Sequence, residues 1–214
     1  MDVQRVSVLV FVLVCGGAAI VARPLAQPAA KNFDQLYEEG QKRNASIKTL
    51  TARFTETTTS SLLTRPLVAR GTVAVERPSR VMLRYSEPDT RLLLIDDKTL
   101  TTTWPTRQVL DIGVAMGRVQ KQFVNGSIAN LRHEFVLDER RLFDTPGAYF
   151  LSMEPKRKQI REALARLDLW VDRDSLFLKS IQMTFPGGET KTMNFEDIVP
   201  NAVLPPNAFV LSHQ

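Results

Sequence analysis

Apolar and polar residues alternate over most of the chain. In segment 50–59, Leu50, Ala52 and Phe54 alternate with polar neighbours, which is typical of a strand with one face in the core. The same period of two recurs further along, and turns rich in Gly, Pro, Asp or Ser separate the segments. Short strands at such spacing predict an antiparallel meander. We expect further strands at 71–76, 80–85, 90–96, 99–104, 108–112, 133–138, 148–155, 166–172, 176–185, 189–198 and 207–212.

Three parts of the chain break this alternation. Residues 33–47 place their apolar side chains on one helical face, and Asn32 is suited to cap the N-terminus of that helix. Residues 113–135 keep no period of two and predict one or two short helices interrupted near Asn125. Residues 156–165 predict a short helical or irregular link. The whole pattern indicates a mainly β fold with some helix, an α+β fold.

One predicted strand is apolar on both of its faces. Residues 92–95 read Leu-Leu-Leu-Ile, so both sides of this strand need to be covered. A filled core on one side with helices outside satisfies this condition. A curved sheet that lines an apolar cavity, capped by the helices, satisfies it too, and such cavities hold apolar ligands. The alternation alone does not choose between these two arrangements.

The N-terminal residues 1–26 have the layout of a secretory signal peptide. The apolar run over residues 6–21 is shorter than a membrane-spanning helix needs, and small residues and prolines follow it. We expect cleavage between residues 22 and 30 and a single mature domain over 27–214; an uncleaved membrane anchor is the alternative. Because Cys15, the one cysteine, lies in this leader, we expect the mature chain to fold in the periplasm without disulfides.

Charge and candidate chemistry favour binding over catalysis. The chain carries 28 Lys and Arg against 23 Asp and Glu, which in an exported protein favours anionic membrane surfaces over nucleic acid. With only His133 and His213, and the cysteine in the leader, we expect neither a zinc site nor a nucleophile–base pair. The sequence contains no phosphate loop, dinucleotide fingerprint or hydrolase elbow. We therefore expect a protein without enzyme activity, cofactor or metal.

Four segments of the chain follow one another in a specific order and spacing: IKTLTARFTE, GTVAVERPSRVMLRYSEPDTRLLLIDDKTL, YFLSMEPK and the closing GGETKTMNFEDIVPN with AFVLS. Together they resemble the LolA-type periplasmic carriers of outer-membrane lipoproteins. The resemblance covers roughly residues 33–212, and the ungapped second segment is its most specific part. It implies an unclosed antiparallel β-barrel with short helices that form a lid over an apolar cavity.

The function implied by this resemblance is that of a carrier. Family members take the acyl chains of lipoproteins from an inner-membrane ABC transporter and pass them to an outer-membrane acceptor, and we expect this chain to do so as a monomer. In the family, an arginine before the proline of the second segment holds the lid closed through hydrogen bonds to lid backbone. Arg77 stands at that position here, and its guanidinium is able to donate to several carbonyls. The candidate lining residues of the acyl-chain cavity are Phe54, Val73, Val75, Val81, Leu83, Tyr85, Leu92 and Leu94.

Two other functions stay open beside the lipoprotein carrier. In the first, the same fold carries another lipid or a polyene that a different exporter loads. In the second, the domain is a lipid-sensing module of an envelope-stress regulator, since that group uses this fold as well.

Overall fold

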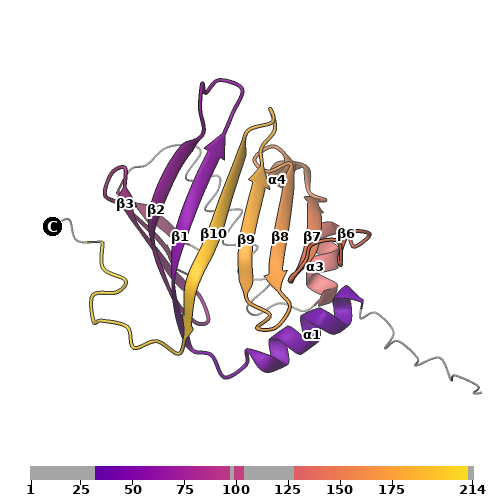
Figure 1. Ribbon diagram of the computed structural model, residues 1–214, viewed down its shortest axis with the longest axis horizontal. Coiled ribbons are helices and arrows are strands. Elements are labelled where there is room, and N and C mark those ends of the chain that lie inside the picture. The colour runs from indigo at the N-terminus through magenta and orange to yellow at the C-terminus, as the bar shows by residue number, and fades with distance from the viewer. Residues whose placement is uncertain (1–31, 97–98, 104–127, 212–214) are drawn as a thin grey trace, which may run out of the picture. The chain divides into compact units, whose positions relative to one another are not determined.

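The alternating segments form one antiparallel sheet of ten strands in the computed structural model (Figure 1). The structure describes residues 32–96, 99–103 and 128–211. The expected leader, the expected strand 108–112 and most of the expected helical segment 113–135 lie outside these residues. The strands are β1 (Thr49–Thr59), β2 (Leu67–Glu76), β3 (Arg80–Glu87), β4 (Arg91–Asp96), β5 (Thr99–Thr102), β6 (Phe135–Asp138), β7 (Ala148–Pro155), β8 (Arg166–Asp172), β9 (Leu178–Thr184) and β10 (Thr190–Pro200).

The order of the strands leaves the sheet open. Neighbours follow one another as β5-β4-β3-β2-β1-β10-β9-β8-β7-β6, so the pairing of β1 with β10 joins the two halves of the chain. Within the described part of the chain, the edge strands β5 and β6 do not pair with each other, and the curled sheet does not close. This confirms the predicted fold class, an unclosed antiparallel β-barrel with short helices.

Helix α1 (Phe33–Arg43) begins where the sequence predicts and ends earlier. The Asn32 side chain accepts a hydrogen bond from the backbone N–H of Gln35 at 2.9 Å, and the Gln35 side chain accepts one from the backbone N–H of Asn32 at 3.1 Å. This capping box fixes the N-terminus of the helix. At the other end, Asn44 is the C-cap, so the helix does not reach residue 47 as predicted.

Two further helices are short. Helix α3 (Ile128–Glu134) includes the first two residues of the expected strand 133–138, which shortens β6 at its N-terminal end. Helix α4 (Lys158–Arg161) lies in the predicted helical or irregular link. Among the helices of the described residues, none has the length and apolar character required to cross a membrane.

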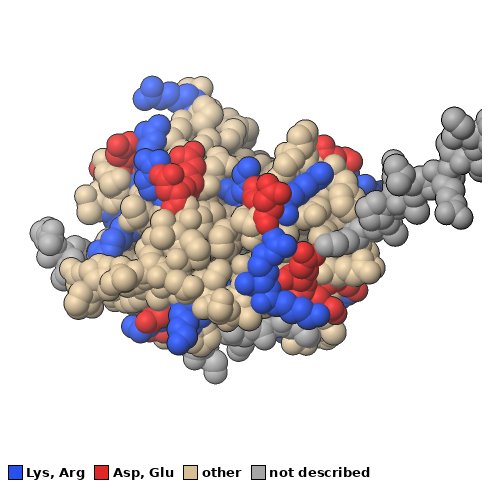
Figure 2. Space-filling model, turned by 60° about the horizontal axis from the view of Figure 1, so that its bottom comes forward, with Lys and Arg blue, Asp and Glu red and all other residues tan. Residues whose placement is uncertain are grey.

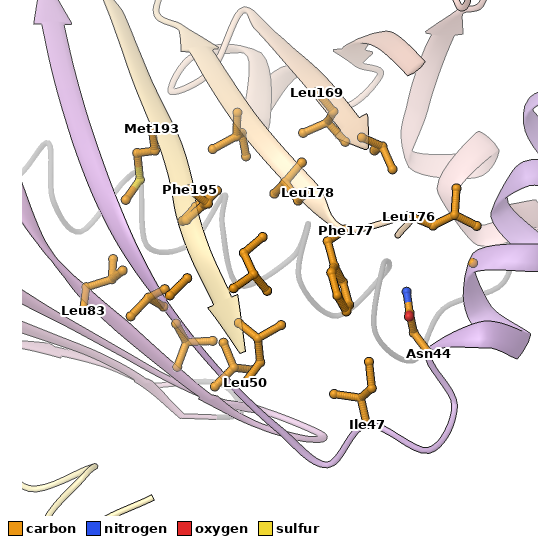
Figure 3. Close-up of a pocket in the computed structure, with 18 of the residues that line it drawn as sticks. Asn44, Ile47, Leu50, Leu83, Leu169, Leu176, Phe177, Leu178, Met193 and Phe195 are labelled. Carbon is orange, nitrogen blue, oxygen red and sulfur yellow. The ribbon is translucent and has the colours of Figure 1, made fainter. Parts of the chain in front are cut away.

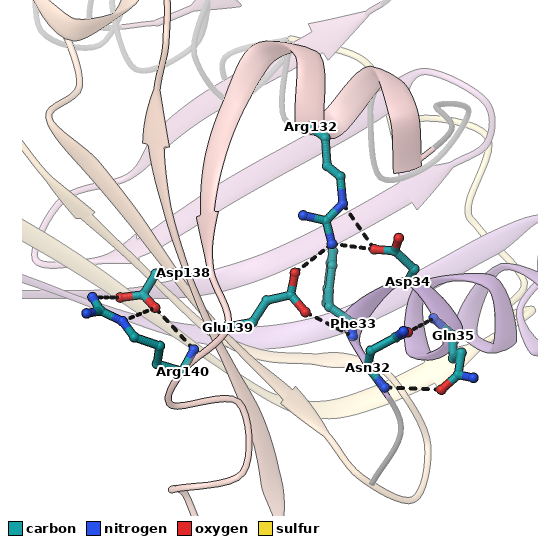
Figure 4. A network of polar contacts seen from close by, with 8 residues as sticks. All are labelled: Asn32, Phe33, Asp34, Gln35, Arg132, Asp138, Glu139 and Arg140. Atoms are coloured by element: carbon teal, nitrogen blue, oxygen red, sulfur yellow. Dashed lines mark hydrogen bonds and ion pairs between the residues drawn. The ribbon is translucent and has the colours of Figure 1, made fainter. Parts of the chain in front are cut away.

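Arg132 of α3 connects the start of α1 to the segment that follows β6 (Figure 4). Its Nε and Nη2 donate to Asp34 Oδ1 at 3.1 and 2.5 Å, and Nη2 also donates to Glu139 Oε1 at 2.6 Å. The second oxygen of Glu139 accepts from the backbone N–H of Phe33 at 3.2 Å. Because hydrogen bonds between charged groups are stronger than neutral ones, this network holds α1 in place against the second half of the sheet.

One face of the sheet, here called the inner face, supplies the main hydrophobic core. Residues that pair across an antiparallel ladder share a face, so the register of β1–β4 defines rows of inner-face side chains. Three rows, taken from the α1 end of the strands, are Leu50–Val75–Val81–Ile95, Ala52–Val73–Leu83–Leu93 and Phe54–Gly71–Tyr85–Arg91. Strands β7–β10 complete this core with side chains such as Leu151, Leu167, Ile181 and Met183.

The outer face of β3 is covered by the C-terminal segment 201–211, which runs beside the first half of the sheet (Figure 1). Arg84 Nη2 donates to the backbone carbonyls of Asn207 and Ala208 at 2.8 and 3.0 Å. The Arg80 guanidinium lies 4.7 Å from the centroid of the Phe209 ring, a cation–π distance. Met82 lies between these two arginines on the same face and is fully buried. The predicted strand at 207–212 is wrong, because the described residues of this segment form turns instead.

The pairing of β4 with β3 shows how the four apolar residues 92–95 are divided between the two faces. Leu93 and Ile95 pair with inner-face residues of β3, whereas Leu92 and Leu94 pair with Arg84 and Met82 on the outer face. Of the two arrangements left open by the sequence, the structure favours the one in which the inner face lines a pocket, and an irregular segment lies over the outer face of the neighbouring strand β3.

Candidate functional site

An apolar pocket of about 410 Å³ lies on the inner face of the sheet (Figure 3). Its described lining comes from both halves of the chain and from α1. In Figure 3, Leu83 and Leu50 project from the first half, Leu169 and Leu178 from the second, and Asn44 marks the end of α1. Pockets of roughly 300–1,000 Å³ with apolar walls are typical of sites for small molecules and acyl groups.

Helix α1 covers one end of this pocket with its apolar face. Phe33, Leu36 and Tyr37 are buried and belong to the lining. The spacing of these residues places them on one side of the helix, so its polar residues face solvent. The helix therefore closes this end of the pocket, which is called the α1 end below.

The structure places most of the predicted lining residues from β2 and β3 on the wall of the pocket. Val73 and Val75 of β2 and Val81, Leu83 and Tyr85 of β3 all line it. Their position on the wall follows from the alternation in these strands, because one apolar face was recognised in each; that they bind an acyl chain stays a prediction.

Leu92 and Leu94 do not line the pocket, and this part of the prediction is corrected. The lining residues of β4 are Leu93 and Ile95 together with Arg91. Since side chains alternate between faces along a strand, an error of one residue in the assignment exchanges all inward-facing residues for outward-facing ones. In a run that is apolar at four consecutive positions the pattern contains no information about which pair faces inward.

Phe54 lies on the inner face but outside the described lining. It is 2% exposed, and its ring makes an edge-to-face contact with Tyr85 at 5.0 Å between centroids. Phe54 thus supports a lining residue from the side.

Arg77 lies on the pocket wall in the turn between β2 and β3. Its Nη1 donates to the backbone carbonyl of Asn44 at 2.9 Å, and its backbone N–H donates to the carbonyl of Lys48 at 2.8 Å. Burial lowers the pKa of the Arg77 guanidinium. The side-chain contact joins the β2–β3 turn to the C-cap of the helix that covers the pocket.

A polar cluster inside the pocket, formed by Glu56, Tyr85 and Lys191, was not predicted as a cluster. Tyr85 Oη donates to Glu56 Oε2 at 2.7 Å, and Lys191 Nζ lies 3.3 Å from Glu56 Oε1. Burial raises the pKa of Tyr85, and the charge and hydrogen bond of Glu56 raise it further, while Arg91 opposes this effect. One signal was present in the sequence, since Glu56 continues the inward phase set by Ala52 and Phe54.

The second half of the chain supplies a further part of the lining that the site prediction did not include. Its strands were recognised as alternating segments, but their position opposite β2 and β3 depends on the pairing of β1 with β10. These lining residues are Leu142, Tyr149, Leu151, Leu169, Val171, Leu176, Phe177, Leu178, Ile181, Met183, Met193, Phe195 and Ile198.

Acidic and basic side chains lie next to one another on the face that carries α1 (Figure 2). On α1 itself, Arg43 forms an ion pair with Glu39 at 3.0 Å. Among the described residues, no three His, Cys, Asp or Glu side chains are grouped so that they could hold a metal ion. The notable feature of the described surface and interior is therefore the apolar pocket.

A family model identifies the kind of protein to which this pocket belongs. Residues 45–212 match the model described as outer membrane lipoprotein carrier protein LolA. This chain belongs to the LolA family. The match covers more than half of the chain and includes all ten strands of the sheet. A comparison with curated proteins gives no match.

Several solved structures are similar to this LolA-family protein. The LolA superfamily protein NE2245 from Nitrosomonas europaea is 11% identical, with 85% of this chain and 98% of that chain covered and a TM-score of 0.42. LppX, a lipoprotein from Mycobacterium tuberculosis, is 7% identical, with 80% of this chain and 96% of that chain covered and a TM-score of 0.41. The matching chain of the MucA/MucB complex from Pseudomonas aeruginosa is 12% identical, with 82% of this chain and 61% of that chain covered and a TM-score of 0.44. At such low identities the family assignment rests on the family model.

Proposed function

We propose that this protein is an exported, non-enzymatic carrier that binds the acyl chains of lipoproteins in its pocket and moves them between the membranes of the envelope. The observation that carries this proposal is the apolar pocket on the inner face of the open sheet. Membership of the LolA family supports it. An inner-membrane ABC transporter would load the carrier, and an outer-membrane acceptor would receive the cargo.

A carrier of acyl chains needs a way to release them. Burying each CH₂ group stabilises the complex by about 0.8 kcal/mol, so one long chain contributes on the order of 10 kcal/mol. A protein that kept all of this energy would not pass its cargo on. If α1 closes over the empty pocket, the stability of this closed form offsets part of the binding free energy. The hydrogen bond from Arg77 to the Asn44 carbonyl is suited to stabilise the closed form. A hydrogen bond from a charged donor is worth about 1.5–3 kcal/mol.

Replacing Arg77 by leucine is expected to leave the fold intact and to slow cargo turnover by about tenfold or more, because the closed form loses this hydrogen bond. The rate of transfer of a fluorescent acyl probe from the loaded protein to acceptor vesicles measures the effect. The matched control is Arg53→Leu, since Arg53 lies on β1, has a 65% exposed side chain and forms ion pairs with Glu196 and Asp197 at the surface. Transfer at the wild-type rate in Arg77→Leu would reject the assignment of Arg77 as a latch.

Replacing Leu83 by tryptophan is expected to weaken binding of the acyl probe by at least about tenfold, because the indole ring is larger than the leucine side chain and occupies the space that an acyl chain needs. Leu83 projects into the pocket in Figure 3. Titration of the probe by fluorescence measures the affinity. Thr72→Trp is the control, since Thr72 is an exposed residue of the neighbouring strand β2. Equal affinities in the two variants would mean that acyl chains bind elsewhere.

The function itself is tested by native mass spectrometry of protein purified from the periplasm under gentle conditions. A co-purifying acylated protein is the expected result. A free lipid in its place would favour the carrier of another lipid. An empty pocket in protein isolated from cells that make lipoproteins would count against both carrier functions.

A further inference from the structure

The inner face of β1–β4 becomes more polar along the strands, away from α1. The inner-face rows nearest α1 contain aliphatic side chains only, whereas the next row contains Tyr85 and Arg91. Glu56 follows on β1, where it pairs with Met193 of β10. Lys191 lies on β10 two residues before Met193, which is further from α1 because β10 runs antiparallel to β1. Figure 3 shows Met193 on the side of the pocket remote from Asn44. The cluster of Glu56, Tyr85 and Lys191 therefore lies at the end remote from the helix, whereas Arg77 lies at the α1 end.

Lys191 has donor capacity that its described neighbours do not use. An ammonium group has three N–H donors, whereas its contact here is with a single carboxylate, Glu56, at 3.3 Å. The carboxylate is shared, because its other oxygen already accepts the Tyr85 hydroxyl at 2.7 Å. The Lys191 side chain is only 15% exposed. An oxygen-bearing group in the pocket would therefore add to the hydrogen bonding of this largely covered ammonium.

The sign of the charge in the pocket favours an acid. Among the described lining residues at this end of the pocket, Arg91 and Lys191 are cationic and Glu56 is the one carboxylate. A neutral head group would make hydrogen bonds with Lys191 but would gain nothing from this excess of positive charge. A carboxylate or a phosphate gains both, and in a poorly hydrated pocket a charge-assisted hydrogen bond is stronger than at the surface.

We propose that the pocket binds amphiphiles with an acidic head, with the carboxylate or phosphate oxygens at Lys191 and the acyl chain extending along the apolar rows toward α1. This inference rests on the proposed function only in that the pocket must take acyl chains. It adds a second class of ligand, in which the acid is inserted into the pocket rather than left at its mouth. The oxyanion can come from a free fatty acid or from a long-chain phosphate ester.

Three probes of equal chain length test the proposal: palmitate, hexadecyl phosphate and hexadecanol, each titrated calorimetrically below its critical micelle concentration into the full chain. At least one acid is expected to bind about tenfold or more tightly than the alcohol, as one charge-assisted hydrogen bond predicts. The tighter of the two acids identifies the source of the oxyanion. If the alcohol binds as tightly as both acids, the acid site is wrong while the carrier function stands. If none of the three binds, the proposed function fails as well.

Variants locate the acid. In Lys191→Met, the three probes are expected to bind about equally, and Lys179→Met, at a lysine whose side chain is 52% exposed on β9, is expected to keep the wild-type preference. Because Lys191→Met leaves Glu56 buried beside an apolar side chain, the double variant Lys191→Met/Glu56→Gln is included. It removes both charges and keeps an acceptor for the Tyr85 hydroxyl. If a folded double variant still prefers the acid to the same degree as wild type, Lys191 is not the anchor.

Discussion

Replacing Gly71 by alanine is expected to destabilise the protein by about 3 kcal/mol. Gly71 lies on β2 between Phe54 of β1 and Tyr85 of β3. A Cβ at this position would come within 2.1 Å of the Arg84 carbonyl oxygen and 2.8 Å of Phe54 Cζ. The first contact is with backbone, so no side-chain rotation relieves it. Phe54 is also packed on all sides, at 2% exposure, and cannot move without disturbing the core.

The sign of this effect makes the measurement informative. Alanine normally stabilises a strand relative to glycine by roughly 0.5–1 kcal/mol, because glycine loses more conformational entropy on folding. Urea unfolding followed by circular dichroism gives the free energy of unfolding, provided that the slope with denaturant is unchanged. Thr72→Ala, at the exposed neighbouring position, is the control and is expected to stay within about 0.5 kcal/mol of wild type. A Gly71→Ala protein as stable as wild type would contradict the close approach of β2 and β3 at this row.

A chain that ends at Pro205 is expected to be less stable by about 3 kcal/mol and to expose apolar surface. The removed segment contains the carbonyls that accept from Arg84 and the ring that lies against Arg80. Without it, Met82, which is fully buried between these two arginines on β3, is expected to become exposed to water. Complete burial of one side chain of this size is worth about 1.5–3 kcal/mol. Urea unfolding and the binding of an apolar dye are the two measurements.

Two point variants, Arg84→Ala and Asn207→Ala, distinguish the loss of the contacts between the C-terminal segment and β3 from nonspecific effects of truncation. Arg84→Ala removes the donor and is expected to reproduce part of the loss in stability, about 1–2 kcal/mol. Asn207→Ala keeps the backbone carbonyl that Arg84 contacts, and its side chain is exposed, so it is expected to behave as wild type. A truncated chain with wild-type stability and no increase in dye binding would show that the segment does not protect the outer face.

The candidate site was predictable where one apolar face was visible in the sequence. The other face of Val73's strand is polar or small, and arginines flank Met82 on the other face of Leu83's strand; both Val73 and Leu83 lie on the wall of the pocket. Leu92 and Leu94 lie in a strand without a polar face, and there the assignment was wrong by one residue. The inward Glu56 and Lys191 fitted the alternation of their strands, but their meeting depends on the pairing of β1 with β10, which are far apart in the chain.

The sequence by itself determined the kind of structure. The period of two, the turn residues between segments and the capping residues of α1 are local signals, and they led to an antiparallel sheet with few helices. The ungapped segment that resembles the LolA family added the expectation of an open barrel with a cavity. Only the tertiary structure decided which face of β4 lines the pocket, what covers its outer face, and which charged groups share the pocket. These three depend on contacts between residues distant in sequence, and a local pattern of polarity contains no record of such contacts.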